Sequence, residues 1–243
     1  MFRFFRKIRN KASLKNNTRK YFFYAIGEVL LVIIGILLAL QINNWNESNK
    51  EKALEYKLID ALITDLNLKK SEAETDLSYG PEQIEALDEI IRAWELNGTL
   101  DTTLDIPYAL RLLGMDKVFF NINSPAYLGL SSSNLWKVLP DSLTRKIDSI
   151  YRISFNQVKI RFEKIREYGT YCRLNFLIPN NLNEFSGDTK SAIGLLNGKE
   201  DELVSFIKQL KSNILSIGNA YKNVLKKIDE VKINLKTYKD SQI

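Results

Sequence analysis

The chain of 243 residues contains no histidine and a single cysteine, Cys172. Histidine is the commonest general base, transition-metal ligand and pH switch near neutrality, so its absence leaves carboxylates as the main reactive groups. One cysteine excludes an intramolecular disulfide, and with it a disulfide-stapled secreted scaffold. The sequence also lacks a glycine-rich phosphate loop and a Walker pattern. These absences argue against an enzyme, and we predict no catalytic, cofactor-binding or metal-binding residues.

Acidic residues are missing from the first twenty positions, and this makes the charge distribution uneven. Residues 1–20 carry +8, residues 47–105 carry −9 and residues 106–243 carry +8, within a net charge of +6 for the chain. Without its first twenty residues the protein is close to neutral. Its basic pI therefore gives no reason to expect a nucleic-acid partner.

One long apolar run organises the chain, and its only formal charge is Glu28. The run covers residues 21–42, and a helix needs about 20 mainly apolar residues to cross a bilayer core about 30 Å thick. We predict a basic cytoplasmic leader at 1–20, a transmembrane helix at 21–45 and an extracytoplasmic helical domain at 46–243.

The charges on either side of the run predict its orientation. Only Lys50, Lys52 and Lys57 follow it closely, whereas eight cations precede it. The positive-inside rule then places the N-terminus in the cytoplasm and the C-terminal domain outside it. For a bacterial cell with two membranes, this topology means the inner membrane and the periplasm. The topogenic charges we select from the leader are Arg3, Arg6, Lys7, Arg9, Lys11, Arg19 and Lys20.

The run is longer than the apolar region of a secretory signal peptide, and no small-x-small cleavage site follows it. It therefore predicts an uncleaved signal anchor. Tyr21, Tyr24 and Trp45 lie where aromatic residues anchor a span at the two interfaces. The leader also interleaves aromatic residues with its cations, so a short interfacial segment on anionic lipid is an alternative to a plain charge cluster.

Glu28 is the one residue of the run that is costly to place in lipid. Gly35 and Ala39 lie within about 20° of it on a helical wheel, and they form a small-xxx-small pair that lets two helices approach closely. We predict that this face contacts the transmembrane helix of a protein partner or of a second copy. The alternative is a carboxylate that reaches the headgroups or is protonated.

The segment with the sequence YAIGEVLLVIIGILLALQINNWNE resembles the N-terminus of a large uncharacterised family of single-span proteins from Bacteroidota-type bacteria. The family is catalogued as a domain of unknown function. A second stretch at 124–151 is similar to a further family block, in which the matching positions are Tyr127, Leu130, Ser132 and Leu135. Thr144 before Arg145 departs from the block. The resemblance implies the single-span topology and implies no activity, cofactor or catalytic residue.

Two helices with apolar residues at alternating steps of three and four are predicted after Pro140, and this spacing is typical of coiled coils and antiparallel bundles. The first stripe is Ile147, Tyr151, Phe155, Val158, Phe162, Ile165, Gly169, Cys172 and Phe176, before Pro179. The second is Leu203, Ile207, Leu210, Ile214, Ile217, Tyr221, Val224, Ile228, Val231 and Leu235. We predict an all-α fold in which one N-terminal transmembrane helix precedes a long-helix antiparallel bundle with coiled-coil-like seams.

Local signals predict the remaining boundaries. Ser48 to Glu51 is a capping box that starts or restarts a helix, and Gly80-Pro81 predicts its end before a second helix at 82–96. Shorter helices are expected at 108–113 and after Ser124-Pro125. The segment 117–122 is ambiguous and could be extended, and 181–196 links the two long helices as a hairpin.

The charged segments and the potentially reactive residues outside the span each allow a structural and a functional interpretation. Packing the acidic early helices on the basic late ones pairs opposite charges, whereas an unpaired basic face would bind anionic lipid or glycan. Cys172 lies on an apolar stripe, which favours a core role over nucleophilic catalysis. Glu85, Asp88 and Glu89 are more typical of a solvated helix face than of a metal site, and Ser131, Ser132 and Ser133 have no base nearby.

The sequence therefore predicts a membrane-anchored, non-enzymatic helical interaction or scaffold protein of the cell envelope. The alternative is a ligand-sensing or regulatory module that couples its external bundle to a membrane partner through Glu28, Gly35 and Ala39. The expected partners are the lipid bilayer and a protein or second copy bound through the transmembrane helix.

Overall fold

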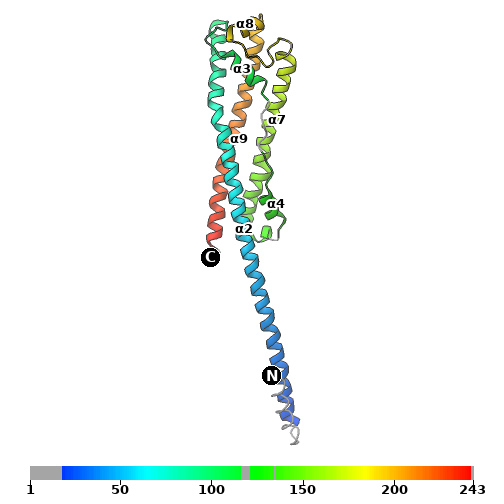
Figure 1. Cartoon of the computed structure of the whole chain (residues 1–243). Coiled ribbons are helices and arrows are strands. Elements are labelled where there is room, and N and C mark those ends of the chain that lie inside the picture. Colours follow the sequence, from blue (N-terminus) through cyan, green and yellow to red (C-terminus); the bar gives the residue numbers. More distant parts are fainter. Residues whose placement is uncertain (1–17, 116–120, 134, 242–243) are drawn as a thin grey trace. The chain divides into compact units, whose positions relative to one another are not determined.

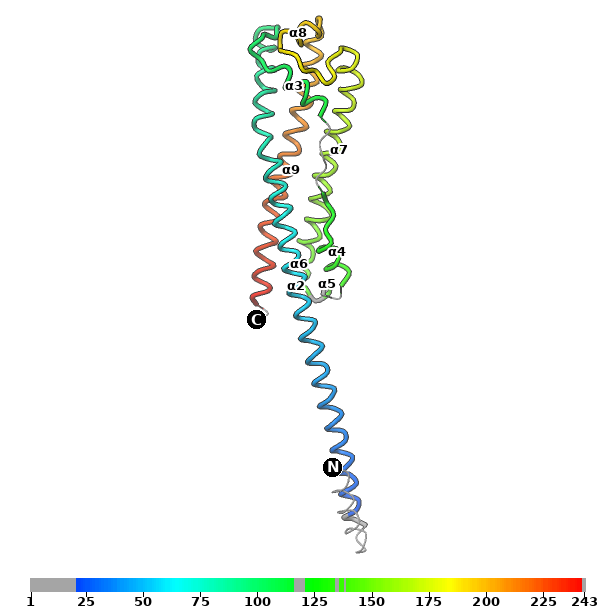
Figure 2. Tube along the Cα trace, viewed as in Figure 1, coloured from blue at the N-terminus to red at the C-terminus, as the bar shows by residue number. Residues whose placement is uncertain are grey.

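The computed structural model describes residues 18–115, 121–133 and 135–241, and every regular element within these ranges is a helix (Figures 1 and 2). The chain divides into two compact units, Met1–Lys57 and Leu58–Ile243. Of the ambiguous segment 117–122, residues 117–120 lie outside the described ranges, and residues 121 and 122 have no regular secondary structure.

The first element is α2 (Thr18–Asn97), a continuous helix of 80 residues. The predicted restart at Ser48 and the predicted end at Gly80-Pro81 are both wrong, because Pro81 lies inside the helix. A proline in a helix interior costs about 3 kcal/mol. Leu66 and Ala73 are buried before Pro81, and Leu87 and Ile90 are buried after it. Packing on both sides therefore offsets the cost of the proline.

Within the described ranges, the second unit continues with nine further elements. They are α3 (Ile106–Leu113), α4 (Pro125–Ser132), α5 (Leu135–Val138), α6 (Asp141–Asp148), the π-helix η1 (Ser149–Ser154), α7 (Phe155–Cys172), the π-helix η2 (Arg173–Leu177), α8 (Thr189–Leu196) and α9 (Glu200–Ser241). Within this unit α2, α7 and α9 lie side by side along most of their lengths (Figures 1 and 2).

Side-chain caps fix the short helices where the sequence offers an Asp or Ser. The Asp105 carboxylate accepts from the Tyr108 N–H at 2.9 Å, so α3 begins at Ile106, two residues before the predicted start. The Ser124 hydroxyl accepts from the Tyr127 N–H at 3.0 Å, which confirms the predicted cap of α4. Asp188 caps α8 in the same way. Each cap satisfies an N–H that the first turn of a helix leaves without a partner.

The predicted apolar stripes face the interior at every position. All nine residues from Ile147 to Phe176 and all ten from Leu203 to Leu235 are buried. They divide between two core clusters that share no buried residue. One cluster contains Ile59, Phe155 and Ile228, and the other contains Leu87, Phe176 and Ile207. The helices α2, α7 and α9 contribute to both clusters.

Gly169 of α7 lies close to the backbone at the end of α3. A Cβ at this position would lie 3.2 Å from the Met115 carbonyl oxygen and 3.4 Å from that of Leu113. A side chain at position 169 would therefore require the Leu113–Met115 backbone to shift by a few tenths of an ångström, which favours glycine at this position of an otherwise apolar stripe.

Candidate functional site

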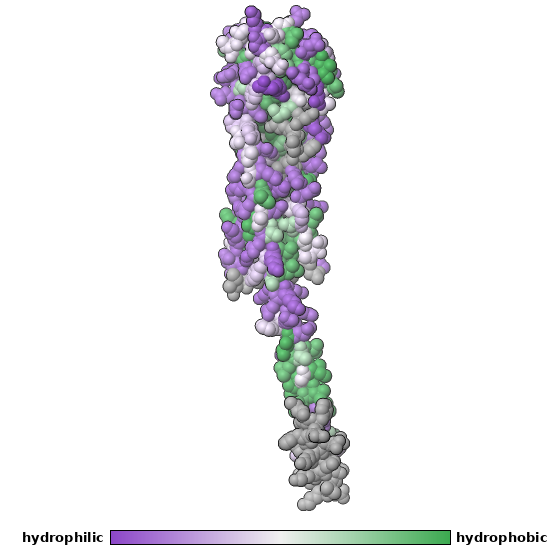
Figure 3. All heavy atoms as spheres, viewed as in Figure 1, coloured by the Kyte–Doolittle hydropathy of each residue, from purple (hydrophilic) through white to green (hydrophobic). Residues whose placement is uncertain are grey.

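The apolar part of α2 is exposed along its whole length. Residues 21–54 are all exposed, and among the described residues α2 is the one helix long and apolar enough to cross a membrane, judged by length and composition. In Figure 3 the atoms of this stretch are mainly green, whereas the visible face of the second unit is mainly purple. An apolar surface of this extent is a candidate lipid-binding or protein-binding surface.

The structure places Glu28, Gly35 and Ala39 on this exposed stretch of one helix. A Cβ added at Gly35 would meet nothing within 4 Å, and the same holds for Gly27. The face thus offers an open backbone beside the one carboxylate of the apolar run.

The aromatic residues expected at the two ends of the run are also exposed. Tyr21 and Tyr24 lie near the start of α2 and Trp45 follows the apolar run. Of the selected leader charges, those from Arg3 to Lys11 lie outside the described residues, and Arg19 and Lys20 belong to the first turn of α2.

In the second unit, three tyrosine–aspartate hydrogen bonds join different helices. The Tyr151 hydroxyl donates to Asp65 Oδ2 at 2.6 Å, and the Tyr221 hydroxyl donates to Asp76. Both aspartates belong to α2, whereas the tyrosines belong to η1 and α9. The Tyr127 hydroxyl of α4 donates to Asp148 Oδ1 at 2.5 Å. These contacts fix α4, η1 and α9 to their neighbours by directional bonds.

Two of these tyrosines belong to an aromatic cluster. The rings of Tyr127 and Tyr151 stack with centroids 4.5 Å apart and planes 9° apart. Trp136 contacts Tyr127 edge-on at 6.1 Å, and Phe155 contacts Tyr151 edge-on at 5.1 Å. Offset and edge-on ring pairs stabilise a protein by about 0.5–1.5 kcal/mol beyond area burial.

The ionisation of the bonded tyrosines determines what they can do. Burial, together with the adjacent Asp148 carboxylate, raises the pKa of Tyr127 to about 12. Burial and the hydrogen bonds to Asp65 and Asp76 raise the pKa values of Tyr151 and Tyr221 further. All three hydroxyls are therefore neutral donors near pH 7, suited to holding helices together and unsuited to acting as bases.

The π-helix η1 brings a buried serine into the same region. Ser154, 1% exposed, accepts from the Lys227 ammonium of α9 at 2.9 Å and donates to the Ser149 carbonyl at 3.2 Å. Ile150, Tyr151 and Ser154 of η1 are all buried, so this short element turns a wide face toward the interior.

Ion pairs connect α2 with α9 along the second unit. Lys208 contacts Glu95 at 2.7 Å, Lys239 contacts Asp60 at 2.7 Å, and Lys211 contacts Asp88. A fourth pair has the opposite arrangement, with Lys70 of α2 and Asp229 of α9 at 2.8 Å. The predicted pairing of acidic early helices with basic late ones is therefore found in the structure. Such partly exposed pairs contribute about 0–1 kcal/mol each.

The cysteine and the serines that were considered for catalysis lie in environments that favour a structural role. Cys172 is buried, and burial raises the pKa of its thiol to about 11, opposite to the shift that activates a nucleophile. The hydroxyls of Ser131, Ser132 and Ser133 donate to carbonyls of α4. Within the described residues no cluster of acidic, cysteine or histidine side chains could hold a metal.

The tyrosine–aspartate bonds are the main polar feature that the sequence interpretation missed, although a signal was present. Tyr151 and Tyr221 occupy core positions of the two apolar stripes, and a buried tyrosine hydroxyl requires a partner. Asp65 and Asp76 each stand next to an apolar core-facing position of α2, Leu66 and Leu77.

The part of the chain that the structure describes is thus all-helical and contains one candidate membrane segment. Residues 28–98 match the model of a family described as "Family of unknown function (DUF6090)", and the match covers most of the apolar run and the rest of α2. Neither the curated proteins nor the solved structures provide a match to the chain.

Proposed function

We propose that this protein is a membrane-anchored, non-enzymatic interaction or scaffold protein of the cell envelope. The observation that carries the proposal is the fully exposed apolar stretch of α2, which continues as the same helix into the core of the second unit. The second unit would be an antiparallel helical bundle with coiled-coil-like seams. Its neutral tyrosines and inert thiol support a binding role rather than a catalytic one.

The proposed topology is an uncleaved signal anchor in a bacterial inner membrane, with the basic leader in the cytoplasm and the second unit in the periplasm. The charge difference across the apolar run supports it. A reporter enzyme that folds only outside the cytoplasm, fused after Ile243, should be active. A reporter active only in the cytoplasm would contradict the orientation.

The proposed partner surface is the face with Glu28, Gly35 and Ala39, which would contact a second copy or the transmembrane helix of another protein. Glu28→Leu or Gly35→Leu should weaken association of this segment in a membrane two-hybrid assay. The first variant removes the polar contact of the carboxylate, and the second blocks the close approach of two helices. Gly27→Leu is the matched control, since it lies about 100° away on the helix and has equally open surroundings. Equal signals from all three variants would refute the face.

A ligand-sensing or regulatory module is the second candidate. The continuity of α2 between the apolar stretch and the core favours it, because a helix can transmit a change in packing. Crosslinking in intact cells separates the two functions. A scaffold should give reproducible membrane-protein partners, whereas a sensor should show a thermal shift with an envelope metabolite and no stable partner.

A further inference from the structure

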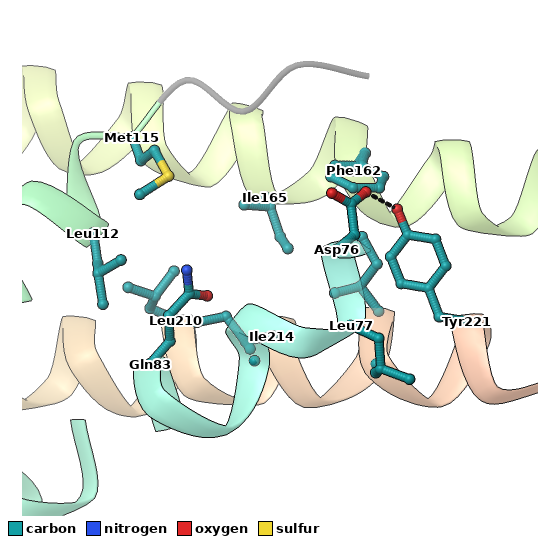
Figure 4. A pocket seen from close by; sticks show the side chains of 13 residues that line it. Asp76, Leu77, Gln83, Leu112, Met115, Phe162, Ile165, Leu210, Ile214 and Tyr221 are labelled. Atoms are coloured by element: carbon teal, nitrogen blue, oxygen red, sulfur yellow. Dashed lines mark hydrogen bonds between the residues drawn. The ribbon is translucent and has the colours of Figure 1, made fainter. Parts of the chain in front are cut away.

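A cavity of about 40 Å³ lies in the second unit where α2 contains Gly80-Pro81. It is lined by residues of α2, α3, α7 and α9 and by Met115, and it separates the two core clusters. Phe162 and Ile165 on its wall belong to one cluster, and Leu112 and Ile214 belong to the other (Figure 4). The cavity is therefore a gap in the packing between two otherwise filled cores.

A buried amide points into this mainly apolar cavity. Gln83 is 7% exposed, and Figure 4 shows its side chain directed into the space among Leu112, Met115 and Ile165. No buried side-chain nitrogen or oxygen of the described residues lacks a hydrogen-bond partner, so the Gln83 amide, to which no described residue is bonded, faces space that water can enter. Removing water from an amide that has no protein partner would cost roughly 1–3 kcal/mol, so space for water beside Gln83 is favourable.

Two further polar groups lie at the same level of α2. The Asp76 carboxylate lines the cavity and accepts from the Tyr221 hydroxyl, which leaves it further acceptor capacity. Pro81 has no N–H, so the carbonyl of Leu77 lacks the donor that an α-helix normally provides. Both Leu77 and Gly80 line the cavity.

We propose that this cavity is an internal water-binding site. One ordered water needs roughly 10–15 Å³ of such space and two to four polar partners, so the cavity can hold two or three waters between Gln83 and Asp76. Water both donates and accepts, and it can serve the amide, the carboxylate and the Leu77 carbonyl together. An organic ligand would be too large, and a single carboxylate would bind a divalent cation poorly.

Radiolytic hydroxyl-radical footprinting of the full chain in detergent tests the site, because X-rays produce radicals from internal waters next to the side chains they touch. Phe162 lines the cavity and is 4% exposed, whereas Phe155 and Phe176 are 0% exposed and lie away from it. We expect Phe162 to be oxidised several-fold faster than these two matched phenylalanines. Equal rates for all three would mean a dry cavity and would overturn the proposal.

The variant Gln83→Leu tests the assigned partner, because leucine has a similar volume and cannot bind water. Oxidation of Phe162 should fall to the rate of Phe155, while the rates of Phe155 and Phe176 stay unchanged and so report an intact fold. Unchanged oxidation of Phe162 in this variant would overturn the role of Gln83. The result is independent of the proposed membrane role, which involves other residues.

Discussion

At the scale of single residues, the tyrosine–aspartate bonds are the most specific contacts of the second unit. Each joins side chains from different helices, and each places a carboxylate in a partly buried position that only a donor can satisfy. Removing the donor therefore does more than delete one hydrogen bond, because it leaves an acceptor without its partner.

Tyr151→Phe removes the donor to Asp65 and keeps the stacked ring. We expect the free energy of unfolding to fall by about 1–2 kcal/mol, the range for a hydrogen bond to a charged group in a partly buried site. Urea denaturation followed by circular dichroism measures the change. Tyr79→Phe is the control, since Tyr79 is exposed and should change stability little; equal effects of the two variants would contradict the assigned role.

The raised tyrosine pKa values predict loss of stability at alkaline pH. Below pH 10, the ordinary pKa of tyrosine, both folded and unfolded chains keep the hydroxyls protonated. As the pH rises above 10, the unfolded chain loses protons that the folded chain retains, so stability falls as the pH approaches and passes the folded value of about 12 for Tyr127. Thermal unfolding at stepped pH should show this fall.

Tyr127→Phe should reduce the alkaline fall, which separates the tyrosine contribution from the loss of lysine ion pairs in the same range. An identical pH dependence in the variant and the parent protein would refute the assignment.

Gly169→Ala tests the close contact between α7 and the backbone at Leu113–Met115. A methyl group 3.2 Å from the Met115 carbonyl oxygen requires this backbone to shift by a few tenths of an ångström, and we expect a loss of about 1–3 kcal/mol. Gly194→Ala in α8 is the matched control, because its Cβ would meet nothing within 4 Å and alanine favours a helix by about 0.5–1 kcal/mol. Opposite signs in denaturant unfolding would confirm the contact.

At the scale of elements, the spacing of apolar residues predicted the helices better than the local start and stop signals did. The three–four spacing identified the buried positions of α7 and α9 because it reflects how these helices pack. One irregularity was informative: Ile147, Tyr151 and Phe155 follow two successive steps of four, and η1 lies between Ile147 and Phe155. The helix end predicted at Gly80-Pro81 was wrong because buried contacts on both sides hold α2 together against the low helix propensity of glycine and proline. A pattern in a single sequence does not reveal such contacts.

Pro81→Ala restores an N–H and the missing hydrogen bond to the Leu77 carbonyl. We expect the free energy of unfolding to rise by about 1–3 kcal/mol, because the strain and the lost bond of an interior proline are both removed. Chemical denaturation of the variant beside the parent protein measures this. A destabilised variant would contradict this account and show that the second unit packs better with proline at this position.

At the scale of the whole molecule, the sequence predicted which charged segments pair, but it did not predict which residues form each ion pair. The acidic and basic segments do pair, yet the pair of Lys70 with Asp229 runs opposite to the overall trend. The tyrosine–aspartate contacts could not be derived, since the rotation of each helix about its axis decides which carboxylate meets which hydroxyl. The composition of the apolar run indicates a membrane segment, and its binding partner has to be identified by experiment.

The two core clusters have a consequence for how the second unit opens. Since they share no buried residue and meet at the cavity beside Gly80-Pro81, each can lose its protection against solvent with limited effect on the other. Amide hydrogen–deuterium exchange should therefore reveal two cooperative groups, divided on α9 between Ile214 and Ile217. A single group spanning all of α9 would show that the long helices bind the two halves into one folding unit.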